Sequence, residues 1–346
     1  MRNFLFCLFS LLILTAFPLK ALELDKDMID DMSRSLSRAL PPTIVGPDDR
    51  KEITGKAEGA EKAVVVFDMT FKQNYLIGCS GAMIGNKTVL TAAHCLMDMK
   101  GNYVDKLTVY ATGIQMQKQQ EANNVSETHQ DTEEDDNSFE AMMNRFKQSS
   151  KQKEKEWEQF APERFGTNFL NAKATSVWVP NGYKEAIRNN DYTKRHNNDY
   201  GIIFLDSELG KEISQNGGQI LGLKALSEQD FYNIDIVVIG RGNDKSAYSL
   251  WKSPGHIKKK DVSWDTNEVW FDADIVIGNS GSPVFKTSDP NNIIALTVEE
   301  TPANYGFPAP NVGLPIRQEI VNNINKVKKG EEGFKSHPLP KDKEGN

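Results

Sequence analysis

The sequence is poor in cysteine and histidine, and it has no excess of positive charge. It contains three cysteines and five histidines in 346 residues, and no pair of histidines stands at a spacing typical of metal ligands. Its formal net charge of −7 also argues against nucleic acid as the main partner. We therefore expect no cofactor, no metal ion and no nucleic-acid partner.

Long apolar runs are also scarce. The one such run covers residues 4–17, follows Arg2 and is too short to cross a bilayer comfortably. With the small residue Ala21 near its end, it predicts a signal peptide over residues 1–21, and an uncleaved anchor is the alternative. We expect an exported monomer, secreted or periplasmic, that does not remain on a membrane after signal cleavage.

Two cysteines, Cys79 and Cys95, remain once this peptide is removed. In an exported protein two cysteines suggest one disulfide. Closing a loop of this length stabilises a fold by on the order of 3 kcal/mol.

Three further segments differ in composition from the rest of the chain. Residues 22–43 are charged and end in prolines, which we interpret as a propeptide before a mature start at Ile44; an ordinary N-terminal extension is the alternative. Residues 115–168 are polar and charged, and we interpret them as a partly helical insertion. It is either a surface excursion or a docking arm for a partner, and its acids do not follow an EF-hand spacing. Residues 329–346 are polar and predict a disordered tail.

Short β-rich runs separated by Gly, Asn and Pro fill most of the remaining chain and indicate an all-β barrel or sandwich. The expected strands cover residues 63–69, 75–84, 88–92, 106–112, 175–179, 201–205, 234–240, 256–262, 268–274, 293–298 and 312–314. Residues 316–328 carry apolar side chains at helical spacing and predict a C-terminal helix packed on the β-structure.

The loop of residues 278–283 (GNSGSP) has the features of one that presents a nucleophilic serine. A serine hydroxyl needs a neighbouring base and donors for the oxyanion that forms. Gly278 lets the backbone turn so that its own N–H and that of Ser280 point to one spot, which makes an oxyanion hole. Glycine- and serine-rich turns are common, so the loop alone does not decide the function.

Two other residues are candidates for the partners of this serine. His94 stands next to Cys95 at the end of a strand of small residues, where it would be a fixed base. Asp199 directly precedes an apolar strand, where its carboxylate can be buried beside the imidazole. A structural histidine and a turn aspartate are the alternative interpretations.

In this order, His94, Asp199 and Ser280 resemble the chymotrypsin-like serine peptidases. The spacing from Cys79 to Cys95, with the histidine just before the second cysteine, is that family's pattern. Four further motifs are similar to the bacterial glutamyl-endopeptidase branch: residues 45–50 (VGPDDR), 198–201 (NDYG), 242–253 (GNDK to WKS) and 278–283 (GNSGSP).

The resemblance covers residues 44–328 apart from the insertion. It implies two packed antiparallel six-stranded β-barrels with the active site between them. It also implies that Ser280 is the nucleophile, that His94 is the general base and acid, that Asp199 orients His94, and that the N–H groups of Gly278 and Ser280 hold the oxyanion. The resemblance further implies that the substrates are proteins or peptides.

The residue before the serine departs from the digestive members of the family. They carry an aspartate that pairs with the new N-terminal amine on activation, whereas this chain has Asn279. An asparagine cannot form that ion pair. The zymogen route of the digestive enzymes is therefore in doubt, although the segment from Ile44 is similar to their mature start.

The expected specificity pocket also departs from the glutamyl branch. Ile275 stands where that branch has a small hydroxyl residue, and Thr297 falls where it has a histidine. Asp274 lies six residues before the serine, the spacing of the pocket aspartate in trypsin-like members, and Glu299 lies on the expected pocket wall. A carboxylate there favours a substrate Lys or Arg. We expect cleavage after Lys or Arg, with cleavage after Glu as the alternative.

A second class of function stays open, namely a secreted binding protein or adhesin that has kept the fold and lost catalysis. Such proteins usually lack at least one of the three catalytic residues. Because all three residue types are present here, the sequence favours a serine endopeptidase.

Overall fold

The computed structural model describes residue 44 and residues 47–71, 74–115, 169–246, 248–263, 266–299 and 311–340. The expected signal peptide and propeptide lie outside these residues, as does the expected insertion apart from Gln115. Within the described part of the chain, no helix is long and apolar enough to cross a membrane.

Six antiparallel strands close into the first barrel. They pair in the order β6-β5-β2-β3-β4-β7, and a direct pairing of β6 with β7 completes the ring. The strands are β2 (Val64–Phe71), β3 (Asn74–Gly85), β4 (Thr88–Thr91), β5 (Lys106–Gln115), β6 (Phe169–Trp178) and β7 (Gly201–Leu205). Their β-branched and small side chains are buried on the inside, which suits a pleated, closed surface. The expected six-stranded antiparallel barrel is confirmed here.

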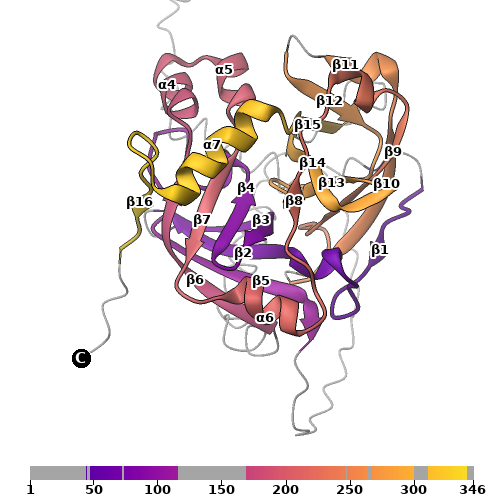
Figure 1. Cartoon of the computed structure of the whole chain (residues 1–346), viewed down its shortest axis with the longest axis horizontal. Helices are drawn as coiled ribbons and strands as arrows, with labels where there is room; N and C mark the ends of the chain where they lie inside the picture. The colour runs from indigo at the N-terminus through magenta and orange to yellow at the C-terminus, as the bar shows by residue number, and fades with distance from the viewer. Residues whose placement is uncertain are drawn as a thin grey trace, which may run out of the picture. The chain divides into compact units, whose positions relative to one another are not determined.

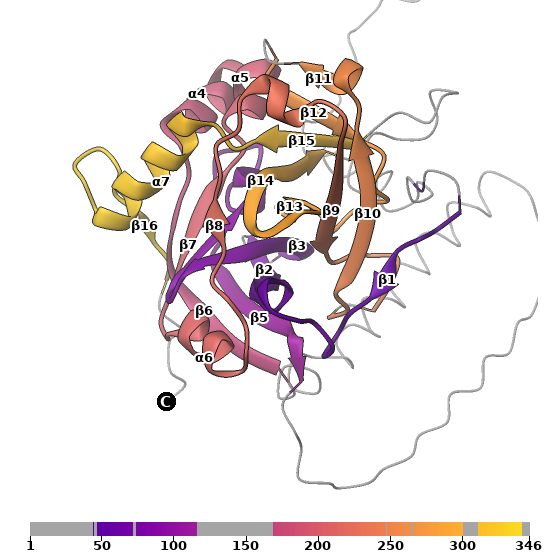
Figure 2. The ribbon, with the colours of Figure 1, turned by 45° about the vertical axis from the view of Figure 1, so that its right-hand side comes forward.

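A nine-stranded sheet forms the second half of the fold. Its main path runs β1-β10-β9-β13-β14-β15-β12-β11, and β8 pairs with β14. The strands are β1 (Lys51–Glu52), β8 (Gly222–Leu223), β9 (Ile234–Gly240), β10 (Trp251–Ile257), β11 (Val262–Ser263), β12 (Glu268–Phe271), β13 (Pro283–Lys286), β14 (Asp289–Glu299) and β15 (Asn311–Pro315). Figure 2 shows β1 lying along β10 at the edge of this sheet.

The second sheet curls around its own core but is not closed by strand pairing among the described residues. Phe231, Val238, Phe271 and Val284 belong to that core and are fully or almost fully buried. The two ends of the sheet approach each other where the Asp272 N–H donates to the carbonyl of residue 256, at 3.4 Å. The chymotrypsin-like all-β class is thus present, and one of its two expected barrels is closed by strand pairing.

The C-terminal helix packs on the first barrel, although it follows the last main strand of the second sheet (Figure 1). Helix α7 (Gln318–Lys329) buries Ile320, Ile324 and Val327 against the first core. On the same side, the Asn323 side-chain amide donates to the Tyr200 hydroxyl at 2.9 Å. This confirms the helix expected from the spacing of its apolar residues.

Three shorter helices were not expected from the sequence. They are α4 (Asn181–Asn189), α5 (Tyr192–Asn197) and α6 (Leu209–Gln215). Asp191 is the N-cap of helix α5, and its side chain accepts the backbone N–H of Lys194 at 2.9 Å, a bond that supports so short a helix. Each of these helices is about two turns long, which is too short for a clear apolar period.

The expectation of a disordered tail from Lys329 is wrong as far as residue 340. The strand β16 (His337–Pro338) pairs with β6 on the outside of the first barrel. The ring of His337 stacks on Tyr103 at 4.1 Å, and Phe334 stacks on Trp178 at 6.0 Å. A few aromatic contacts on an existing strand edge order this segment, and a polar composition does not reveal such contacts.

Candidate active site

His94 and Asp199 lie together at one end of the first barrel. His94 belongs to the short 3-10 turn η2 (Ala93–Cys95) after β4, and Asp199 lies between α5 and β7. One carboxylate oxygen of Asp199 accepts the His94 backbone N–H at 2.9 Å, and the other lies 2.7 Å from His94 Nδ1. Since a carboxylate only accepts hydrogen bonds, it selects the ring form with the proton on Nδ1 and leaves Nε2 as the basic nitrogen.

The two side chains differ in their access to water. The Asp199 side chain is 10% exposed and that of His94 is 32% exposed. The carboxylate is thus held inside the protein while the ring remains reachable from solvent. A general base needs this arrangement, because a buried partner fixes the orientation of its ring and the ring stays accessible to a substrate.

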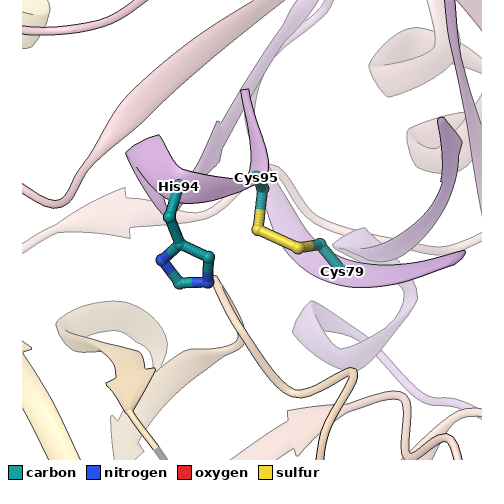
Figure 3. A group of neighbouring side chains, drawn as sticks. All are labelled: Cys79, His94 and Cys95. Atoms are coloured by element: carbon teal, nitrogen blue, oxygen red, sulfur yellow. A yellow bond between two sulfur atoms is a disulfide. The ribbon is translucent and has the colours of Figure 1, made fainter. Parts of the chain in front are cut away.

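The disulfide expected from the sequence is present and holds the His94 turn. Cys95, the residue after His94, is bonded to Cys79 on β3 (Figure 3). A ring nitrogen of His94 and the two sulfur atoms lie within 4.8 Å of one another. These sulfurs are bonded to each other and are not thiolates, so the cluster is a structural cross-link rather than a metal site.

Ser280 is hydrogen-bonded to β3, and the residue after it packs against the end of β4, the strand that leads to His94. The Ser80 N–H donates to the Ser280 carbonyl at 2.9 Å. The next residue, Gly281, has φ +78° and packs so closely that an added Cβ would lie 2.2 Å from Thr91 Oγ1. Thr91 ends β4 and leads into the His94 turn, so the serine and the histidine are attached to neighbouring points of one barrel.

The peptide group that carries the Gly278 N–H is held at its opposite side. The carbonyl of that peptide belongs to Ile277 and accepts the backbone N–H of Asn243 at 2.7 Å. The C=O and N–H of a trans peptide point in opposite directions, so this bond fixes the direction of the Gly278 N–H. Gly278 itself has φ +105°, a backbone conformation that residues other than glycine rarely adopt.

The peptide group that carries the Ser280 N–H is held in the same way. Its carbonyl, that of Asn279, accepts the Ser282 N–H at 2.8 Å. The buried side chain of Asn279 accepts the Val276 N–H at 3.0 Å and so binds the loop internally. With both carbonyls occupied, the two N–H groups expected to form an oxyanion hole have fixed directions.

Ser80 is a residue that the sequence reasoning missed. It is fully buried, and its hydroxyl donates to the Gly278 carbonyl at 3.0 Å and accepts the Arg241 N–H at 2.9 Å. Its own carbonyl accepts the Thr91 hydroxyl at 2.8 Å. Ser80 therefore links β3, β4, the segment after β9 and the serine loop. Its position after Cys79 was the only available signal, because all of its partners except Thr91 are far away in the sequence.

The expected specificity residues lie on both sides of the serine loop. Asp274 is 3% exposed, and its carboxylate accepts the Asp49 backbone N–H at 3.4 Å. Ile275 and Thr297 are buried, and the Thr297 carbonyl accepts an N–H of the serine loop at 2.8 Å. Glu299 ends β14, and its side chain lies outside the described part of the structure. Asp274 therefore contacts the N-terminal segment and precedes the serine loop by four residues.

A second polar network, also missed, joins the two halves of the fold. Tyr248 donates a short hydrogen bond to Asp68 on β2, and Arg241 Nη1 lies 4.0 Å from the same carboxyl. Burial raises the pKa of the Asp68 carboxyl and lowers the pKa of the Arg241 guanidinium to about 10. The network is a buried structural contact, and it shares Arg241 with Ser80 through the backbone.

Comparison with known proteins supports the same family. The trypsin family model matches residues 53–156. A glutamyl endopeptidase of Bacillus licheniformis is 24% identical over 293 residues, which is 83% of this chain and 69% of that protein. An extracellular metalloprotease of Bacillus subtilis is 18% identical over 297 residues, which is 85% of this chain and 72% of that protein.

The fold is also found among solved structures. A structure of Glu endopeptidase in complex with MPD superposes with a TM-score of 0.54 at 18% identity, covering 83% of this chain and 99% of that one. The barrel, the order of the motifs and these similarities agree. The chain therefore has a chymotrypsin-like fold, contains a segment that matches the trypsin family, and is similar in sequence to a glutamyl endopeptidase.

Proposed function

We propose that this peptidase is exported and cleaves proteins or peptides with Ser280 as the nucleophile, His94 as the general base and acid, and Asp199 as the group that orients His94. Ser280 Oγ attacks the carbonyl carbon of the scissile bond while His94 Nε2 takes the hydroxyl proton. The carbonyl electron pair moves to the oxygen, which the N–H groups of Gly278 and Ser280 stabilise.

The second half of the reaction uses the same groups. The C–N bond breaks, the leaving amine takes the proton from His94, and the acyl chain remains on Ser280. Water then attacks the ester with His94 again as the base, and Ser280 regains its proton as the acid product leaves. No metal or cofactor takes part in these steps.

One observation carries this proposal most directly: the two-point contact between Asp199 and His94. The carboxylate binds both the backbone N–H and Nδ1 of that histidine, at 2.9 and 2.7 Å. A structural histidine does not need a buried carboxylate on one nitrogen with the ring left reachable from water. A general base needs both.

For specificity we propose cleavage after Lys or Arg, with the carboxylate of Asp274 binding the substrate cation. Its burial and its position four residues before the serine loop support this, because a cationic partner stabilises a buried carboxylate. Cleavage after Glu is the second candidate, and the relationship to a glutamyl endopeptidase favours it.

A peptide library that varies the residue before the scissile bond tests both proposals. The processed protein should cleave it, a serine-directed fluorophosphonate should label Ser280, and Ser280→Ala should abolish cleavage and labelling. Preference for Lys and Arg that Asp274→Ser removes would support the pocket assignment. Cleavage after Glu would overturn that assignment and leave the catalytic residues in place. A processed protein with neither cleavage nor label would point to a binding protein or adhesin.

A further inference from the structure

The N-terminal segment is attached to the second half of the fold by a buried arginine. The guanidinium of Arg50 donates to Asp244 at 2.6 and 3.1 Å and to Asp48 at 2.8 Å. The Arg50 side chain is 3% exposed. Burial alone would lower the pKa of Arg50, yet the hydrogen bonds that it donates to Asp48 and Asp244 raise it. The hydrogen bond from Arg50 also holds the pKa of Asp48 well below its usual range.

The contact leads directly into a tight turn. Lys245 N–H donates to the Gly242 carbonyl at 3.2 Å, and Asp244 lies inside this turn. An added Cβ at Gly242 would lie 2.5 Å from the Asp244 carboxylate, 2.7 Å from Val276 and 3.1 Å from Arg50. The Arg50 guanidinium, the Asp244 carboxylate and the segment before the serine loop therefore pack around one glycine.

The next residue of the turn orients an oxyanion donor. Asn243 N–H is the group that binds the Ile277 carbonyl at 2.7 Å and so fixes the direction of the Gly278 N–H. Asn243 directly precedes Asp244, the residue whose carboxylate Arg50 holds. A turn released from Arg50 is free to move away, and the peptide of residues 277–278 then loses the bond that orients it.

We propose that Arg50 is a positioning residue for the oxyanion hole: through Asp244 it holds the turn whose Asn243 N–H sets the Gly278 donor. The proposal rests on the proposed function, because it needs Gly278 to act as an oxyanion donor. It makes catalytic competence depend on the placement of the segment that follows the expected propeptide.

The asparagine before the serine explains why such a contact is needed. Asn279 uses its side-chain oxygen within the loop, on the Val276 N–H, and carries no charge for an N-terminal amine. The ion pair with Arg50 supplies instead a charged contact between the N-terminal segment and the loop region. This contact acts on the Gly278 donor through Asn243, whose N–H binds the Ile277 carbonyl.

The test compares Arg50→Met and Arg50→Lys with the wild type and with Lys224→Met. The control breaks the ion pair between Lys224 and Asp289, which is 2.7 Å long and exposed on the lysine side. For each protein, kcat and KM are measured on the best library substrate. Affinity is measured for two ligands of that sequence, a trifluoromethyl ketone and the matching alcohol. Ser280 adds to the ketone to form an oxyanion, whereas the alcohol binds without one.

Loss of an oxyanion donor lowers kcat by about 10²–10³-fold, and a displaced donor should lower it by part of that, on the order of 10–100-fold for Arg50→Met. We expect KM and the affinity for the alcohol to change by less than about threefold, while the ketone loses affinity in parallel with kcat. Arg50→Lys should restore part of kcat, and Lys224→Met should behave as the wild type.

Three results would overturn the proposal: an unchanged kcat, a loss that falls on KM, or equal weakening of ketone and alcohol. If Arg50→Met does not fold, Asp244→Asn replaces it, with the same expectations and the same refuting results. A wild type that neither cleaves peptides nor takes the fluorophosphonate label refutes the proposed function, and this inference falls with it. If the wild type is active and the Arg50 and Asp244 variants have the same kcat and ligand affinities as the wild type, only this inference is refuted.

Discussion

Replacing Ser80 by alanine removes one hydroxyl from the point where the serine loop meets the first barrel. That hydroxyl donates to the Gly278 carbonyl at 3.0 Å and accepts the Arg241 N–H at 2.9 Å, and the residue has no exposed surface. The backbone bond from Ser80 to the Ser280 carbonyl does not involve the side chain. The change therefore removes two hydrogen bonds and leaves the main-chain contact.

The size of the effect follows from what is left behind. A buried donor or acceptor that loses its partner costs about 1–3 kcal/mol. With a carbonyl and an N–H both affected, Ser80→Ala should lower the free energy of unfolding by about 2–6 kcal/mol. The loss of kcat should be smaller than that for a missing oxyanion donor, about tenfold, because the Asn279 N–H still binds the Val276 carbonyl at 3.0 Å.

Unfolding in urea should be measured in a Ser280→Ala background, where autolysis cannot contribute, and kcat in the active protein. Ser253→Ala is the matched control. Ser253 is 3% exposed, and its hydroxyl has no hydrogen-bond partner among the described residues. Its removal should be neutral or slightly stabilising.

Unfolding of Ser80→Ala and Ser253→Ala at the same urea concentration with equal slopes would refute this expectation. That outcome would mean that the Gly278 carbonyl and the Arg241 N–H find other partners without loss. A large loss of stability with full kcat would keep the structural part and discard the link to catalysis.

Three further changes have defined expectations. Asp199→Asn should lower kcat about 10⁴-fold with little change in KM, because the amide no longer fixes the proton on Nδ1 of His94; a loss below tenfold in steady-state assays would contradict that role. Burial raises the pKa of Tyr200 to about 12 from 10.0, so only the unfolded chain ionises between these values. Stability that is present below pH 10 should fall up to pH 12. Burial also raises the pKa values of Tyr183 and Tyr248, so Tyr200→Phe should make that fall less steep in alkaline unfolding curves without abolishing it; equal curves would refute the role of Tyr200. Arg241→Met should cost about 3–5 kcal/mol in urea unfolding by leaving Asp68 buried without its cation, and adding Asp68→Leu should recover most of it; a double variant as unstable as the single one would argue against the pairing.

Local patterns were sufficient to predict most of the strands and the catalytic candidates. His94, Asp199 and Ser280 each stand in a short motif whose residue types a nucleophilic site requires, and the disulfide followed from two cysteines in an exported chain. The strands were visible as apolar runs between turn residues, since strand formation depends mainly on neighbouring side chains. The roles of the three residues and the specificity remain predictions.

The contacts that hold these residues in place were decided only by the tertiary structure. Ser80 and Gly278 are 198 residues apart, and Arg50 and Asp244 are 194 apart. Nothing in a buried serine or an N-terminal arginine indicates a partner at that distance, because hydrogen bonds of this kind exist only once two halves of the fold meet. The sequence determined which groups can do chemistry, and the packing of the two halves determined which groups hold them.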